Sequence, residues 1–156
     1  MKSKIGGLAL LLSGLPMALW AADLAVQDAW VRAIPPNMQT TAAYMVLRNA
    51  GTSGKTVVGA ASPLFARVEF HETVQQGGVA AMMARDSLVI DAGGQVTLKP
   101  GGYHMMLIGL QGKPLQAGDK VPLKLRLSDG SEVAINADVR AAQTPAAQEQ
   151  HHHHGH

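Results

Sequence analysis

The stretch VPLKLRLSDGSEVAINADV, residues 121–139, decides the fold class, because its odd-numbered positions are apolar on both sides of a central turn. An apolar residue at every second position is the pattern of a β-strand with one buried face. Asp129 and Gly130 are typical turn residues, so the stretch predicts a hairpin with a two-residue turn.

Similar short runs recur along the chain, and segments rich in glycine and proline separate them. We expect further strands over residues 24–34, 41–47, 55–60, 64–73, 79–83, 88–90, 95–98 and 103–110. Many short strands with frequent turn signals predict an all-β fold, and specifically an immunoglobulin-like β-sandwich. We find no internal repeat and no second domain.

The two ends of the chain have compositions of their own. Residues 1–21 combine a basic start, an apolar stretch and small residues at the end, which predicts a secretory signal peptide. Residues 141–156 turn to Ala, Gln, Thr and Pro and then to His, which predicts a disordered His-rich tail. Residues 22–140 between them fit one domain, and no segment after the leader has the roughly 20 apolar residues of a membrane span.

Charge and cysteine content exclude several classes of function. The chain has 13 basic and 11 acidic residues, but Lys2 and Lys4 lie in the predicted leader, so the mature domain is close to neutral. A neutral domain lacks the electrostatic basis for binding nucleic acid. No residue is a cysteine, which excludes disulfides, thiolate zinc sites, a lipid-modified cysteine and a Cys-ligated blue-copper centre.

Two histidines and two methionines stand at a spacing that indicates a soft metal ion. The pattern is His71, ten residues, Met82, twenty-one residues, His104, one residue, Met106. Imidazole and thioether together favour Cu(I), and the thioethers need no deprotonation before they bind. Free imidazoles become protonated below about pH 6.5, so we expect copper affinity to fall below that pH.

The predicted strands give these residues a geometry. If Gln76 and Gly77 are the centre of a hairpin turn, His71 lies directly across from Met82, with Cβ atoms about 4.5–5.5 Å apart. His104 and Met106 are two residues apart on one predicted strand, so they also share a face. Each pair could therefore contribute two ligands to one metal ion.

The same spacing resembles a known family, the periplasmic PCu(A)C-type copper chaperones, over roughly residues 22–139. Further matching words are VEFHET at 68–73 and LKPGGYHMML at 98–107. The resemblance implies a cupredoxin-like β-sandwich in the periplasm that binds Cu(I) through His71, Met82, His104 and Met106. It also implies a carrier rather than an enzyme, which passes copper toward the CuA or CuB centre of cytochrome c oxidase. The accepting partner would be an oxidase subunit or a fellow assembly chaperone, and we expect the carrier to be a monomer.

Other interpretations stay open at this point. The domain could instead store copper or confer copper tolerance, it could be a β-sandwich interaction module without a metal, or it could be a copper-dependent redox enzyme. The tail could capture Cu(II), or it could be an affinity tag. Its candidate ligands are His151, His152, His153, His154 and His156.

Neighbouring residues have simpler expected roles. We expect Met45 and Met105 to fill the core, and Met83 to pack inward on the strand face opposite Met82. Glu72 is the candidate to orient His71 from outside the ligand set. Trp30 and Tyr103 are expected to be core or rim aromatics.

Overall fold

The structure, a computed structural model, describes residues 23–142. The predicted leader and the tail from residue 143 onward lie outside the described residues. The ten strands are β1 (Leu24–Arg32), β2 (Thr40–Asn49), β3 (Lys55–Ala61), β4 (Phe65–Gln76), β5 (Val79–Arg85), β6 (Leu88–Ile90), β7 (Gln95–Leu98), β8 (Tyr103–Leu110), β9 (Lys120–Leu127) and β10 (Glu132–Arg140). Every strand expected from the sequence is present, so the prediction of an all-β fold is confirmed. Residues 23–142 contain no helix long and apolar enough to cross a membrane.

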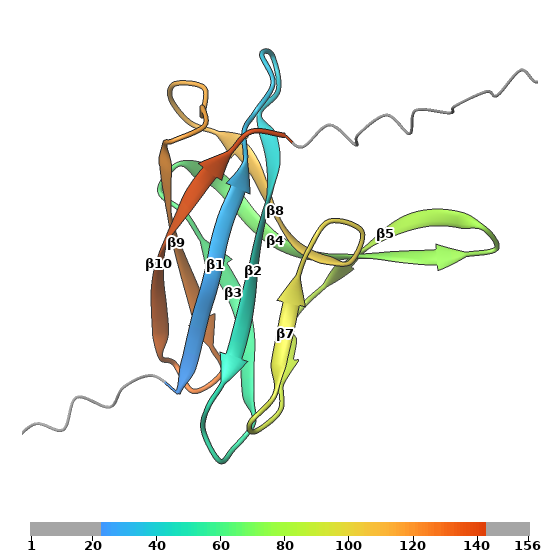
Figure 1. The fold of residues 1–156 in the computed structure, drawn as a ribbon, viewed down its shortest axis with the longest axis vertical. Coiled ribbons are helices and arrows are strands. Elements are labelled where there is room, and N and C mark those ends of the chain that lie inside the picture. The colour runs from blue at the N-terminus through green and yellow to red at the C-terminus, as the bar shows by residue number, and fades with distance from the viewer. Residues whose placement is uncertain (1–22, 143–156) are drawn as a thin grey trace, which may run out of the picture.

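The ten strands are joined by hydrogen bonds into one sheet, in the order β5-β4-β8-β7-β2-β1-β10-β9-β3-β6. Figure 1 shows β10, β1 and β2 running side by side through the body of the molecule. Strands distant in this order also touch, since β3 contacts β4 and β6 contacts β7. The sheet therefore curls over a shared core, and its naming as a cupredoxin-like sandwich remains a prediction.

The core is built from the alternation seen in the sequence. Val121, Leu125 and Ala137 are fully buried, and Met45 and Met105 are buried as expected. Burying a valine, leucine or methionine side chain contributes about 1.5–3 kcal/mol. β5 contributes no buried residue, and the hairpin of β4 and β5 extends away from the body (Figure 1). This hairpin is therefore held mainly by its own hydrogen bonds and by the inner part of β4.

The hairpin of β9 and β10 has a longer turn than we predicted. Glu132 pairs with Arg126, and the Leu127 amide donates a hydrogen bond to the Ser131 carbonyl, so three residues, 128–130, form the loop. A two-residue turn at Asp129 and Gly130 would have paired odd with even positions and set apolar side chains opposite polar ones. The three-residue loop, with Gly130 at a φ of 84°, keeps the apolar positions on one face.

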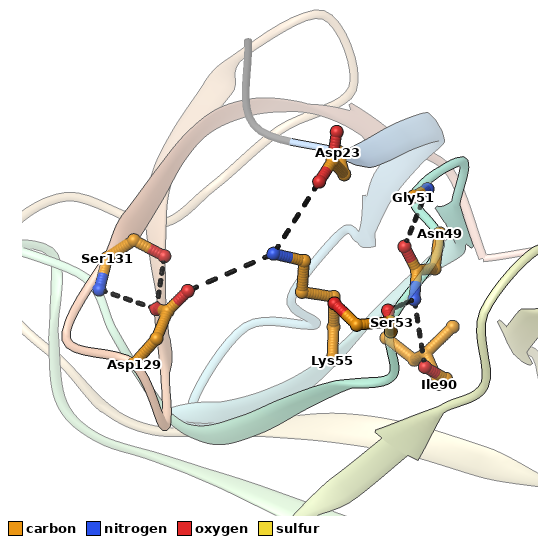
Figure 2. Close-up of polar contacts among 8 residues, drawn as sticks. All are labelled: Asp23, Asn49, Gly51, Ser53, Lys55, Ile90, Asp129 and Ser131. Atoms are coloured by element: carbon orange, nitrogen blue, oxygen red, sulfur yellow. Dashed lines mark hydrogen bonds and ion pairs between the residues drawn. The ribbon is translucent and has the colours of Figure 1, made fainter. Parts of the chain in front are cut away.

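A buried asparagine holds the loop that follows β2. The Asn49 side chain donates to the carbonyls of Ser53 (2.8 Å) and Ile90 (3.1 Å) and accepts from the Gly51 amide (3.0 Å), as Figure 2 shows. Nearby, Lys55 lies between two carboxylates, 3.7 Å from Asp23 and 3.9 Å from Asp129. The asparagine ties β2 to β6, whereas the lysine pairs are partly exposed and add little stability.

Candidate metal centre

The four predicted ligands lie on one face of three neighbouring strands. His71 on β4 pairs directly with His104 on β8. Met106 follows His104 by two residues, so it shares this face, and Met82 on β5 pairs with Thr73, two residues beyond His71. The register therefore brings all four side chains to the same side of the sheet.

The predicted pairing of His71 with Met82 is wrong by two residues. In the structure Gln76 pairs with Val79, so His71 lies opposite Ala84 and Met82 lies diagonal to His71. The turn is centred on Gly77 and Gly78, whose φ angles are 57° and 80°. Two positive φ angles in succession are the requirement of the tight hairpin turn that matches strand twist, and glycine meets it without steric cost. A shift of two residues preserves the shared face but lengthens the expected separation to about 7–8 Å.

The two histidine rings lie close together, and each has a buried ring nitrogen without a hydrogen-bond partner. Their ring centroids are 5.9 Å apart. Within residues 23–142, the buried side-chain nitrogen and oxygen atoms that lack a hydrogen-bond partner are His71 Nδ1 and His104 Nε2. A buried polar atom without a partner is costly and unusual, so two of them on a directly paired couple of histidines need an explanation. A metal ion held by both nitrogens would supply it.

The other nitrogen of each ring is anchored. His71 Nε2 lies 3.0 Å from Glu69 Oε2, and His104 Nδ1 lies 3.1 Å from the Gly102 carbonyl oxygen. Because the ionised carboxylate and the carbonyl can only accept, these ring nitrogens donate, which leaves His71 Nδ1 and His104 Nε2 unprotonated in the neutral rings. Anchoring through the second ring nitrogen is typical of metal-binding histidines, and it fixes both the tautomer and the ring orientation.

Glu69, rather than Glu72, is the carboxylate that holds His71. The hydrogen bond from His71 lowers the pKa of Glu69, and the charge of Arg67, which lies 3.0 Å from the same carboxylate, lowers it further. Glu72 instead accepts two hydrogen bonds from Arg85 (2.8 and 2.5 Å). The sequence spacing could have identified Glu69 as the partner of His71. Glu69 precedes His71 by two residues and so shares its face of the strand, whereas Glu72 lies on the opposite face.

The methionines open onto a cavity of about 570 Å³ whose lining includes Met82, His104 and Met106. His104 is 5% exposed, Met106 is half-buried and Met82 is 62% exposed, so the donors range from the protein interior to solvent. Tyr44 also lines this cavity, and burial raises the pKa of its hydroxyl. Among the lining residues, Met82, Met106 and His104 offer neutral sulfur and imidazole donors, which suit Cu(I) better than a hard cation.

Met83 and Trp30, which lie near the candidate site, had expected positions that the structure tests. Met83 was expected to pack inward but is 40% exposed, because the projecting hairpin has no core on either face. Trp30 is a partly buried aromatic as expected, and its ring lies 4.6 Å from that of Tyr44. The candidate tail ligands lie outside the described residues.

The chain belongs to the LpqE-like lipoprotein family, whose sequence model matches residues 24–139. It is 40% identical over 121 residues to a lipoprotein of Leifsonia xyli subsp. xyli, a match that covers 77% of this chain and 71% of that protein. The chain itself contains no cysteine to carry a lipid.

The chain also resembles solved structures of copper-bound proteins. The Cu(I) form of DR1885 from Deinococcus radiodurans is 38% identical, with a TM-score of 0.61 over 77% of this chain and 81% of that one. A copper-bound PCuAC domain from PmoF2 is 24% identical, with a TM-score of 0.65 over 76% of this chain and 93% of that one. The second likeness concerns the fold alone, which is that of PCuAC domains. At the level of fold, the resemblance seen in the sequence is therefore confirmed.

Proposed function

We propose that this protein is a Cu(I)-binding metallochaperone that acts outside the cytoplasm, in the periplasm. One Cu(I) is held by His71, Met82, His104 and Met106. The observation that carries this proposal is the pair of buried, unpartnered nitrogens on two directly paired histidines, beside a cavity lined by two methionines. Membership of a lipoprotein family supports a location outside the cytoplasm, and the 38% identical relative solved in a Cu(I) form supports the choice of metal.

The ligand chemistry favours a carrier over an enzyme. Neutral thioethers bind Cu(I) without proton release, and the half-exposed donors lie where an incoming partner's ligands can reach them. We propose that the copper passes to a CuA or CuB centre of cytochrome c oxidase, directly or through a fellow assembly protein. The His-rich tail, in this proposal, gathers Cu(II) while the folded site holds Cu(I).

The decisive experiment is an anaerobic Cu(I) titration of the full chain with sulfur-sensitive X-ray absorption. Wild-type protein should bind one Cu(I) with both sulfur and nitrogen ligands. His104→Ala and Met106→Ala should each lose at least about tenfold in Cu(I) affinity. Even residues that only support a metal ligand usually cost about tenfold or more when they are removed, and a ligand should cost at least as much. Met83→Ala is the matched control, because Met83 is an exposed methionine on the opposite face of β5. Binding without sulfur in the coordination sphere would refute the assignment.

Two further measurements test the finer parts of the proposal. Deleting residues 141–156 should weaken Cu(II) uptake and leave the Cu(I) site intact, and loss of the Cu(I) site on deletion would contradict this division. Loaded protein mixed with a copper-free soluble CuA domain should transfer its metal. Failure to transfer to that acceptor, with Cu(I) binding intact, would favour copper storage or tolerance over delivery.

A further inference from the structure

A third methionine, outside the ligand spacing, lines the same cavity as the proposed copper ligands. Met38 lies in the loop between β1 and β2, far from the other cavity methionines in sequence, yet it borders the cavity together with Met82 and Met106. Its side chain is 54% exposed. An isolated exposed methionine would need no explanation, but this one adds a further soft donor to a cavity that two methionines already line.

The backbone around Met38 is fixed by a well-defined turn. The Met38 amide donates to the Pro35 carbonyl at 3.2 Å, and Asn37 has a φ of 69°. Proline at the second position and a positive φ at the third are the features of a type II turn. Pro36 restricts the chain further, so the position of Met38 is set before any ligand arrives.

The same turn is tied to the strand that carries two of the proposed ligands. The carbonyl of Gln39, next to Met38, accepts hydrogen bonds from the amides of Gly109 (2.9 Å) and Leu110 (3.0 Å) on β8. The placement of Met38 relative to His104 and Met106 is therefore maintained by main-chain contacts. Its side chain, with three rotatable bonds and no branching, remains free to change rotamer.

We propose that Met38 is an exchange ligand, a thioether that binds Cu(I) transiently as the ion enters or leaves the site; this rests on the function proposed above. On departure, the Met38 sulfur forms a bond to copper as the bond to one inner ligand breaks, and the acceptor then displaces Met38. The copper stays Cu(I) throughout, so no oxidant or reductant is needed. Because Met38 binds copper only while another ligand is being exchanged, it influences the rate of transfer more than the equilibrium affinity.

The test is the rate of Cu(I) transfer from the loaded full-length protein to bathocuproine disulfonate, followed anaerobically by stopped flow. Met38→Leu removes the sulfur but retains a flexible apolar side chain of similar size. Met83→Leu is the control, since it makes the same change at an exposed methionine that does not line the cavity. Far-UV circular dichroism and equilibrium competition verify that each variant is folded and loaded.

We expect transfer from Met38→Leu to be about tenfold slower than from wild type, which is the smallest effect usual for residues that support a metal site. Transfer from Met83→Leu should stay within about twofold of the wild-type rate. A small chelator has no docking surface, so slower transfer reports the metal and not a lost protein contact. Equal rates for wild type and Met38→Leu, or equal slowing in both variants, would overturn the role of Met38 and leave the chaperone proposal standing. Wild-type protein that bound no Cu(I) would overturn both.

Discussion

Adjacent methionines on β8 should respond in opposite ways to the same substitution. Met105 is fully buried among core side chains, whereas Met106, on the other face of the strand, is half-buried at the cavity. Truncating a buried methionine to alanine removes its transfer free energy and leaves a void, at a typical cost of 2–5 kcal/mol. We expect about 3 kcal/mol for Met105→Ala, a large share of the stability of a domain of this size.

For Met106→Ala the void merely enlarges a cavity that already exists, so the free energy of unfolding should fall by about 1 kcal/mol or less. The entropy of unfolding is about 2.1 cal/mol/K per residue, or about 0.25 kcal/mol/K for the 120 described residues. Met105→Ala should then lower Tm by about 12 °C, and Met106→Ala by about 4 °C or less.

The assays are urea and thermal unfolding of the copper-free proteins, followed by Cu(I) competition at 25 °C, where both variants are folded. Met105→Ala should retain one-to-one Cu(I) binding, and Met106→Ala should lose at least about tenfold in affinity. The reasoning would be refuted if the two phenotypes were exchanged, or if both variants lost copper and stability together.

Three more predictions concern the fold around the site. Asn49→Ala should cost about 2–4 kcal/mol in urea unfolding because it leaves buried backbone groups without partners, and a cost below about 1 kcal/mol would contradict the network drawn in Figure 2. Gly78→Val should raise the free energy of the hairpin turn by about 1–2 kcal/mol, because φ is 80° there; hydrogen exchange should quicken across β4 and β5, and unchanged exchange would refute it. Hydrogen bonds from Ser131 and Lys120 lower the pKa values of Asp129 and Asp138, so their contribution to stability is complete above the unfolded pKa near 3.9 and is lost as pH falls through the lower folded values. Tm measured from pH 7 to pH 2 should therefore decline below about pH 4, and a constant or rising Tm there would show that these pairs do not act.

The strands could be predicted from the sequence because burial on one face imposes an alternation that is visible residue by residue. The register of the hairpins could not be predicted as well, because it depends on which residues adopt a positive φ. At residues 76–78 the choice between a turn centred on Gln76 and Gly77 and one centred on Gly77 and Gly78 moves Met82 by two places relative to His71. At residues 128–130 an extra loop residue moves the pairing by one place, which decides whether apolar positions face one another across the hairpin.

The candidate ligands could be chosen from their spacing and chemical type, which need no register. Their supporting groups could not, since the Gly102 carbonyl is invisible in a side-chain pattern and Glu69 competes with Glu72 for the same role. Met38 lies in a loop far from the motif, and only the folding of β2 against β8 brings it to the cavity.

The extension of β4 and β5 beyond the body has a thermodynamic consequence. Met82 belongs to a segment with little packing of its own, whereas His104 belongs to the well-packed interior. Segments with few packed neighbours open at a lower free energy than the whole domain does. An ion that needs donors from both parts stabilises only the joined arrangement, by an amount that grows with the ratio of its free concentration to its dissociation constant. Binding of the ion should therefore make the hairpin of β4 and β5 more rigid, and slower hydrogen exchange of its backbone amides would measure this change.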